Sequence, residues 1–311
     1  MIWRRRTLMQ AALATAMPSP GRCSPSSRAS SHHAKVNGQV RVGGVPVHYE
    51  IRGSGRPMIL IHGFVVDSRS LMGAMEPAFA HKEGWRRIYF DMPGMGKTPA
   101  SEAITSSDDM LKLILGFIDT VIPGERFALV GQSYGGYLAR GVLAHKANAI
   151  DGMSLVCPVA IAERSKRDLP PRTVVTKDDA WLASLSRADA DAFTPNFVVQ
   201  TEPTWKRFRD ELLPAIRGAD QPFLEKLSQR YPLSFDVDTT PLTKPVLMLT
   251  GHQDSDVGYR DQWQLLQNYP HATFAVLDGA GHGLAIEQAG LFQTLTQEWL
   301  DRVDAASGRQ G

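Results

Sequence analysis

The sequence of 311 residues has few cysteines, little excess charge of either sign and no long apolar segment. Its two cysteines, Cys23 and Cys157, do not make a disulfide framework. Histidines and acidic residues show no metal-ligand spacing such as His-Glu-x-x-His, so a metal-dependent active site has no support. We therefore expect neither a metal nor a cofactor.

The formal net charge is +2, from 34 basic and 32 acidic residues. Five of the basic residues lie before residue 35, in a segment without acidic side chains: Arg4, Arg5, Arg6, Arg22 and Arg28. The rest of the chain carries 29 basic and 32 acidic residues, a balance of −3. Because binding to phosphates needs positive charge on the folded part, we expect no nucleic-acid partner.

Residues 1–34 are rich in serine, proline and arginine and are not expected to pack. Their apolar stretch, residues 8–17, is interrupted by Gln10 and, at about ten residues, is too short to span a bilayer, so stable membrane insertion is not expected. Arg5 and Arg6 before Thr7 resemble a weak twin-arginine export signal. The other interpretation is a disordered extension. A cytoplasmic location is expected, with export as the alternative.

From residue 36 the pattern changes to short β-type runs bounded by glycine and proline. Two runs joined by Gly43-Gly44 predict a hairpin over residues 36–42 and 45–52. Continuous apolar runs predict strands that are buried on both faces, over residues 58–61, 87–91, 127–130, 153–157, 246–250 and 273–277. Helical patterns alternate with them, over residues 107–122, 134–146, 260–268 and 287–303. This alternation predicts an α/β fold with a mostly parallel central sheet flanked by helices.

Residues 158–241 break the alternation and hold nine of the 20 prolines. We predict a helical lid here, inserted into a core formed by residues 35–157 and 242–304, with a flexible tail over 305–311. The lid carries eight aromatic residues: Trp181, Phe193, Phe197, Trp205, Phe208, Phe223, Tyr231 and Phe235. They either form the packing core of the lid or line a substrate pocket above the carboxyl ends of the strands.

The motif Gly131-Gln132-Ser133-Tyr134-Gly135-Gly136 lies between a predicted strand and a predicted helix. This is the context of a Gly-x-Ser-x-Gly turn, in which glycines allow close backbone approach and the strained turn lifts the serine hydroxyl clear of the sheet. A flexible glycine loop with an incidental serine is the alternative. We predict that Ser133 is a nucleophile.

A serine hydroxyl needs a base, and the base needs an orienting carboxylate. Asp254 and His282 follow two successive predicted strands, and loops after parallel strands converge at one edge of a sheet. Ser133, His282 and Asp254 are therefore expected to meet. Asp256 and Asp278 are the alternative acids.

A tetrahedral intermediate also needs donors for its oxyanion. Ile61-His62-Gly63-Phe64 follows another predicted strand, and this arrangement nominates the backbone N–H groups of Phe64 and Tyr134. His62 is an alternative base, but a histidine at this place is expected to hold the loop in shape.

With these motifs, residues 36–303 resemble the α/β-hydrolase fold superfamily, in its form with a serine nucleophile and a single helical lid. The resemblance rests on His62-Gly63, Asp91-Met92-Pro93-Gly94-Met95-Gly96, the residues Gly131 to Gly136, Gly251-x-x-Asp254-x-x-Val257 and Gly281-His282. It implies a Ser-His-Asp triad that acts without a cofactor, and a non-catalytic turn for the Asp-x-Pro-Gly-x-Gly segment.

Departures from subfamily patterns narrow the expected chemistry. Ser133 stands where haloalkane dehalogenases and epoxide hydrolases have aspartate, and the loop after His62-Gly63 lacks the Gly-Pro-Gly run usual in carbon–carbon hydrolases. We expect a serine hydrolase that cleaves a carboxylic ester or lactone of a small to medium apolar substrate through an acyl-enzyme. The alternatives are a carbon–carbon bond hydrolase of vinylogous diketones and a non-enzymatic small-molecule receptor on the same fold. The oligomeric state stays open.

Overall fold

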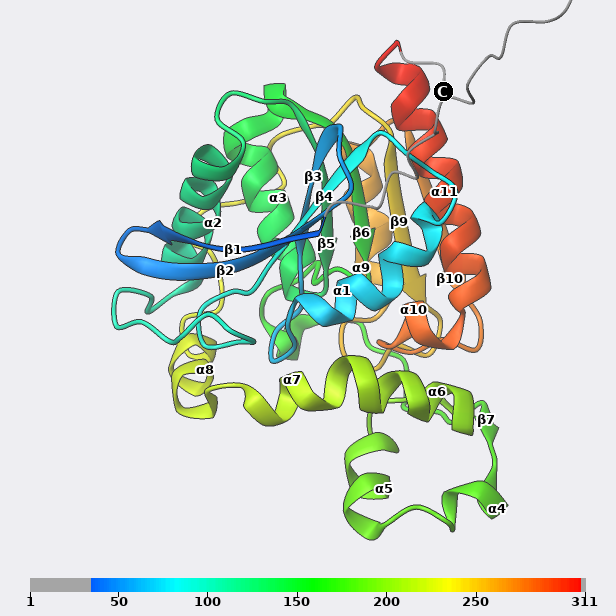
Figure 1. Ribbon diagram of the computed structural model, residues 1–311. Coiled ribbons are helices and arrows are strands. Elements are labelled where there is room, and N and C mark those ends of the chain that lie inside the picture. The colour runs from blue at the N-terminus through cyan, green and yellow to red at the C-terminus, as the bar shows by residue number, and fades with distance from the viewer. Residues whose placement is uncertain (1–34, 309–311) are drawn as a thin grey trace, which may run out of the picture. The chain divides into compact units, whose positions relative to one another are not determined.

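The computed structural model describes residues 35–308, so the predicted leader and the end of the predicted tail lie outside the described part of the chain. Within residues 35–308, eight strands form one sheet in the order β1-β2-β4-β3-β5-β6-β9-β10 (Figure 1). Their bounds are β1 Lys35–Val42, β2 Val45–Arg52, β3 Arg56–Ile61, β4 Trp85–Phe90, β5 Phe127–Gln132, β6 Ile150–Val156, β9 Val246–Gly251 and β10 Ala272–Leu277. All neighbouring pairs from β4 to β10 are parallel, which confirms the predicted mostly parallel sheet.

The antiparallel part of the sheet is the predicted hairpin of β1 and β2. Val42 pairs with Val45, and the two residues between them, Gly43 and Gly44, have φ values of 54° and 86°. Both positions therefore lie in the left-handed region that a two-residue hairpin turn requires, and glycine adopts it without steric cost. β2 then pairs antiparallel with β4, which attaches the hairpin to the parallel strands.

The central strands are buried on both faces, as their continuous apolar runs predict. Every residue of β3 and β9 is buried. The same prediction is wrong for β10, where five of the six residues are half-buried or exposed and Val276 is 37% exposed. β10 is the last strand in the order, so it has a neighbouring strand on one side only.

Helices cover both faces of the sheet (Figure 1). α1 (Ser68–Met75) and α11 (Ala289–Ala306) contact one another on one face, while α2 (Ser107–Val121) and α3 (Tyr134–Lys146) contact one another on the other. Among the helices of the described residues, none combines the length and the apolar character needed to cross a bilayer. The other helices of the core are α9 (Arg260–Gln264), α10 (Leu284–Glu287) and the 3-10 turns at Glu76–Phe79, Ala147–Ala149 and Leu265–Asn268.

Two helix predictions differ from the structure. α1 was not expected, because its eight residues include Gly73 and three of them are serine or arginine. It begins at Asp67, whose side chain accepts a hydrogen bond from the Arg69 N–H and satisfies one of the free amide groups of the first turn. The predicted helix over 287–303 corresponds to α11, which begins at Ala289 because the backbone at Gln288 lies outside the helical region, with φ −122° and ψ 45°.

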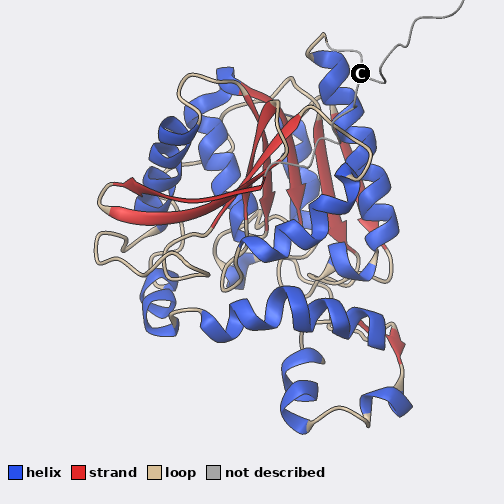
Figure 2. Cartoon of the chain, viewed as in Figure 1, coloured by secondary structure: helices blue, strands red, loops and turns tan. Residues whose placement is uncertain are grey.

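Residues 158–241 lie between β6 and β9 and form short helices joined by loops (Figure 2). We call this segment the insertion. Four of its aromatic residues form a separate hydrophobic cluster: Phe193, Phe197, Trp205 and Phe208, together with Leu213. The elements of the insertion are the helices α4 Asp179–Leu182, α5 Arg187–Phe193, α6 Glu202–Arg207, α7 Leu213–Gly218 and α8 Gln221–Ser228, the turns Arg164–Lys166 (3-10) and Phe208–Leu212 (π), and the paired strands β7 Thr176–Lys177 and β8 Val199–Gln200.

Candidate active site

Ser133 occupies a strained turn between β5 and α3. Its φ is 55° and its ψ is −117°, a conformation that costs a non-glycine residue about 1–3 kcal/mol and persists only when the surroundings enforce it. Close backbone packing around the flanking glycines enforces this conformation. A Cβ on Gly131 would lie 2.4 Å from the Gly135 carbonyl oxygen, and one on Gly135 would lie 2.1 Å from the Ile61 carbonyl oxygen. The glycines of the motif are therefore required by the close packing of this turn against the end of β3.

The structure brings Ser133, His282 and Asp254 into one hydrogen-bonded chain. His282 Nε2 lies 2.9 Å from Ser133 Oγ, and His282 Nδ1 lies 2.8 Å from Asp254 Oδ2. The Nδ1–H donates to the carboxylate, so in the neutral imidazole Nε2 is the acceptor for the serine proton. This is the geometry of a nucleophile, a base and an orienting acid.

Asp254 is buried, whereas the alternative acids are not placed to orient His282. Asp256 forms an ion pair with Arg164 at 3.0 Å, and Asp278 accepts a hydrogen bond from Gln253 at 2.7 Å. The other oxygen of Asp254, Oδ1, accepts the backbone N–H groups of Asp256 and Val257 at 2.9 and 3.0 Å. These bonds hold the carboxylate in position, with Oδ2 directed to His282.

The protonation states follow from this pairing. Burial opposes the charged imidazolium, but the Asp254 carboxylate outweighs it, and with a contribution from Asp256 the pKa of His282 rises to about 9. Burial also opposes ionisation of Asp254, yet His282 and the two backbone N–H groups keep the pKa of Asp254 below its ordinary value. Asp254 is therefore ionised at neutral pH and stabilises the imidazolium that forms when His282 accepts a proton.

The two backbone N–H groups predicted to bind the oxyanion, those of Phe64 and Tyr134, lie in segments next to Ser133. A Cβ on Gly63, the residue before Phe64, would lie 3.4 Å from the Ser133 Cβ. Tyr134 is the first residue of α3, so its N–H has no partner within the helix. The rings of Phe64 and Tyr134 meet edge to face at 5.4 Å. Both amides lie in segments adjacent to the nucleophile, and their role as donors stays a prediction.

His62 has both ring nitrogens occupied by the backbone. Its Nδ1 lies 2.7 Å from the Gly63 carbonyl oxygen, and its Nε2 accepts the Met92 N–H at 2.9 Å. Burial lowers the pKa of His62, so the neutral ring that this bonding requires is the stable form. His62 thus connects the loop after β3 to the segment after β4 and is not directed at Ser133.

Ser133 and His282 both line a cavity of about 840 Å³. Its walls are mainly apolar, and the insertion supplies many of them, including Phe197, Phe208 and Leu212. Two of the aromatic residues in the insertion's own cluster thus also face the cavity, so the two roles considered for them coexist.

Glu287 is a positioning residue that no sequence motif indicated. It is mostly buried, and its carboxylate accepts the backbone N–H of Gly281 at 2.7 Å and that of Val198 at 2.6 Å. Gly281 precedes His282, and Val198 belongs to the insertion, so one carboxylate connects the two segments. In the sequence, Glu287 is only the first residue of a predicted helix, and its partners lie in segments that the fold brings together.

Cys157, Asp254 and His282 have ligand atoms within 4.8 Å of one another, the spacing of a metal site. The chemistry of the group fits a metal poorly. Burial, followed by the Asp254 charge, raises the pKa of Cys157 well above its ordinary value, so the thiol is not the thiolate that binds metals. Asp254 and His282 already bond to each other.

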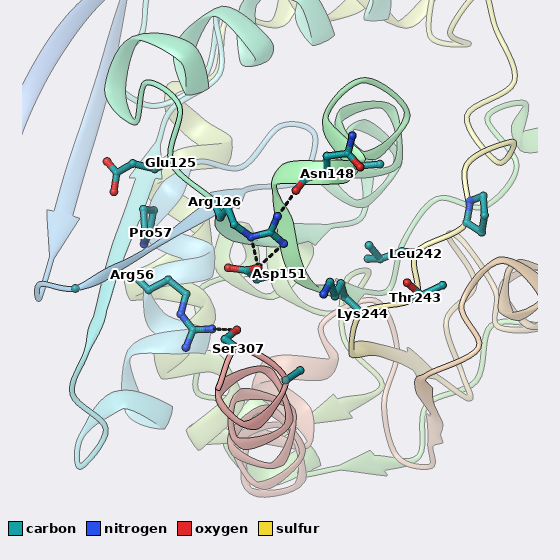
Figure 3. Close-up of a pocket in the computed structure, with 14 residues that line it drawn as sticks. Arg56, Pro57, Glu125, Arg126, Asn148, Asp151, Leu242, Thr243, Lys244 and Ser307 are labelled. Atoms are coloured by element: carbon teal, nitrogen blue, oxygen red, sulfur yellow. Dashed lines mark hydrogen bonds and ion pairs between the residues drawn. The ribbon is translucent and has the colours of Figure 1, made fainter. Parts of the chain in front are cut away.

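A second cavity, of about 730 Å³, opens at the other edge of the sheet (Figure 3). It includes Arg126, directly before the first residue of β5, whereas Ser133 follows the last residue of that strand. Arg126 pairs with Asp151, and Arg56 donates to Ser307 at 3.0 Å. The two cavities thus lie at opposite ends of β5, and the hydrogen-bonded chain of Ser133 belongs to the first.

Comparisons with known proteins agree with this architecture. A family model described as the alpha/beta hydrolase fold matches residues 56–289. The chain is 23% identical over 275 residues to a 2-hydroxy-6-oxo-6-(2'-aminophenyl)hexa-2,4-dienoic acid hydrolase from Metapseudomonas resinovorans, covering 88% of this chain and 93% of that protein. It is also 23% identical to monoacylglycerol lipase ABHD6 from Bos taurus, covering 77% of this chain and 74% of the lipase.

Among solved structures, an alpha/beta superfamily hydrolase from Oenococcus oeni PSU-1 aligns with a TM-score of 0.79 and 26% identity, over 86% of this chain and 99% of that one. An esterase from Exiguobacterium antarcticum aligns with a TM-score of 0.66 at 18% identity, which shows a shared fold alone. The relatives include an enzyme named as the hydrolase of a dienoic acid and one named as a monoacylglycerol lipase, so the names alone do not select one reaction.

Proposed function

Since the chain belongs to the α/β hydrolase fold family, we propose that it is a serine hydrolase that cleaves a carboxylic ester or lactone through an acyl-enzyme. The observation that carries the proposal is the hydrogen-bonded chain from Ser133 through His282 to Asp254, at the wall of a largely apolar cavity. A chain of this kind supplies what ester cleavage needs without a cofactor.

In the proposed reaction, Ser133 Oγ attacks the ester carbonyl carbon and its proton passes to His282 Nε2. The carbonyl oxygen becomes an oxyanion, which the N–H groups of Phe64 and Tyr134 stabilise. When the tetrahedral intermediate collapses, the bond to the leaving alcohol breaks and the alcohol takes the proton from His282. Water, deprotonated by His282, then releases the acid and restores Ser133.

The insertion is proposed to act as a lid that shapes the substrate site. It contributes apolar walls to the cavity that Ser133 lines, and its Tyr231 ring lies 5.8 Å from the ring of Phe64. An apolar wall beside the nucleophile favours a substrate with an apolar acyl or alcohol part and excludes water from its reacting carbonyl.

The first test is Ser133→Ala, assayed with para-nitrophenyl butanoate. We expect kcat/KM to fall by about a thousand-fold or more, with the thermal unfolding temperature preserved. Ser228→Ala is the matched control, because Ser228 lines the same cavity while its Oγ donates to the Glu225 carbonyl. Equal activity of wild type and Ser133→Ala would refute the proposal.

A carbon–carbon bond hydrolase is the second candidate, favoured by the name of the Metapseudomonas resinovorans relative, which covers 88% of this chain. Such an enzyme would use the same three residues on a vinylogous diketone. A substrate panel that pairs aryl esters with a ring-fission dienoic acid separates the two. Higher kcat/KM on the dienoic acid, lost in Ser133→Ala, would replace the ester by the carbon–carbon bond as the scissile bond.

A further inference from the structure

The cavity beside Ser133 contains one cationic side chain without a carboxylate partner. Of the two arginines that line the cavity, Arg164 pairs with Asp256 at 3.0 Å. Arg167 forms no ion pair with a carboxylate among residues 35–308, and its bonds go to carbonyl oxygens instead. Its Nε donates to Ile161 at 2.8 Å, its Nη1 to Asp256 at 2.9 Å and its Nη2 to Ala162 at 2.9 Å.

Those three bonds fix the orientation of the Arg167 guanidinium. The charge of Asp256 also acts on it, but the Asp256 carboxylate forms its ion pair with Arg164. Carbonyl oxygens supply partial charge but no full negative charge, and a guanidinium has five N–H donors, so donors remain beyond the three in use. The group is half-buried, and this burial lowers the pKa of Arg167 below its ordinary value. A cation held in a partly desolvated wall gains most from an anionic partner, because the interaction is less screened there than in water.

Tyr231 lies beside Arg167 on the same cavity wall. Both residues line the cavity, and the guanidinium charge acts on the Tyr231 hydroxyl, which has one proton to donate. The ring is fixed by its neighbours, since it lies 4.7 Å from the ring of Tyr134 and 6.2 Å from that of Tyr137. Its backbone carbonyl accepts the Ser107 hydroxyl at 2.6 Å. The hydroxyl and the guanidinium thus form a rigid pair of donors.

The pair is close enough to the reacting groups to meet a bound substrate. Tyr231 contacts the rings of Phe64 and Tyr134, whose amides are the proposed oxyanion donors. The charge of Arg167 also acts on His282, where it opposes protonation of the imidazole. A substrate whose ester lies at Ser133 and whose chain extends along this wall therefore places its far end near Arg167.

We propose that Arg167 and Tyr231 form an anion-binding subsite, which selects substrates that carry a carboxylate remote from the scissile ester or lactone. The inference rests on the proposed serine hydrolase and adds the class of its substrate. A carboxylate is the group that matches a planar guanidinium fork with an adjacent hydroxyl donor, and its two oxygens can accept from both.

The test uses pairs of esters that differ by one charge. The anionic member is the mono-para-nitrophenyl ester of hexanedioic, octanedioic or decanedioic acid. The neutral member is the same compound with its free carboxylate converted to a methyl ester. Wild type is expected to prefer the anionic ester of at least one chain length by about ten-fold or more in kcat/KM. In Arg167→Met the ratio of kcat/KM for the anionic ester to kcat/KM for its neutral partner should fall about 10- to 100-fold, and the effect of Arg167 on His282 cancels in this ratio.

Two further variants keep the test decisive, because Arg167→Met also removes three structural hydrogen bonds. Tyr231→Phe preserves the ring and removes only the hydroxyl, and should lower kcat/KM for the anionic ester alone. Lys206→Met removes another cation of the insertion, which pairs with Glu202, and should leave the preference unchanged because neither residue lines the cavity. Equal losses on charged and neutral esters in Arg167→Met and Tyr231→Phe, or no preference in wild type, would overturn the subsite.

A binding measurement separates the subsite from the proposed reaction. Calorimetric titration of Ser133→Ala with the anionic ester and its methyl diester needs no turnover. Tighter binding of the anionic ester, lost when Arg167→Met is added, supports the subsite. This holds even if wild type hydrolyses neither ester, although that result would refute the ester hydrolase proposal. Equal affinity for both ligands overturns the subsite even where Ser133-dependent hydrolysis stands.

Discussion

Gly135→Ala probes the contact between the Ser133 turn and the loop that follows β3. The added methyl group would lie 2.1 Å from the carbonyl oxygen of Ile61 and 2.4 Å from that of His62. Non-bonded contact requires about 3.5 Å between heavy atoms, and backbone atoms cannot rotate away as a flexible side chain does. The start of α3 and the end of β3 must therefore separate by about 1 Å.

Two effects follow from this separation. Overpacking costs about 1–3 kcal/mol, partly offset by the helix propensity of alanine, so we expect the thermal unfolding temperature to fall by about 2–8 °C. The displaced carbonyls directly precede Gly63 and Phe64, so the proposed oxyanion donors move relative to Ser133. A displacement of this size can lower kcat by about a hundred-fold.

The assay combines ester hydrolysis kinetics with differential scanning calorimetry, and Gly290→Ala is the control. Gly290 is the second residue of α11, as Gly135 is of α3, but no atom lies within 4 Å of the methyl group that alanine would add there. This control should keep kcat and unfold at the same or a slightly higher temperature. Wild-type kcat and an unchanged unfolding temperature in Gly135→Ala would refute the packing argument.

Two other predictions concern His282 and its supports. Only the neutral imidazole accepts the serine proton, so with the pKa of His282 raised to about 9 by Asp254 and Asp256 against burial and Arg167, kcat/KM should rise with pH, reach half its maximum near pH 9 and level off above that pH. Asp256→Asn removes a negative charge and should move this rise to lower pH; an unmoved profile contradicts the assignment. Glu287→Gln places an amide NH₂ or a weaker acceptor before three backbone N–H donors, those of Gly281, Val198 and Val199, and should cost about 1–3 kcal/mol of stability and lower kcat. The surface variant Glu298→Gln, which loses only an exposed pair with Arg302, should change neither by more than about 0.5 kcal/mol; equal effects in the two variants would contradict the role of Glu287.

The sequence predicted the parts of the fold that depend on residues close together in the chain. The hairpin follows from Gly43-Gly44 between two β-type runs, and the parallel sheet follows from apolar runs that alternate with helical patterns. The predicted burial of β10 is wrong because an apolar run does not show whether a strand has neighbouring strands on both sides. The predicted helix over 287–303 begins two residues before α11, because Glu287 and Gln288 continue the same helical pattern.

The nominated site residues were placed together by topology. Ser133, His282 and Asp254 follow three strands of one parallel sheet, and their hydrogen bonds join residues 149 and 28 positions apart. The choice of Asp254 over Asp256 and Asp278 needed the tertiary structure, because all three lie in loops at the same edge and only one is buried against His282.

The sequence by itself determined the class of chemistry. The serine turn with its glycines, and the acid and the base that follow it, each lie in a short sequence motif. What only the tertiary structure decided is the environment of that chemistry. Contacts between the insertion and the core hold Arg167 against the Asp256 carbonyl, connect Glu287 to Val198 and form the cavity walls. Such contacts depend on how segments far apart in the chain pack together. A local sequence pattern does not predict which carbonyl, carboxylate or ring a given side chain will contact.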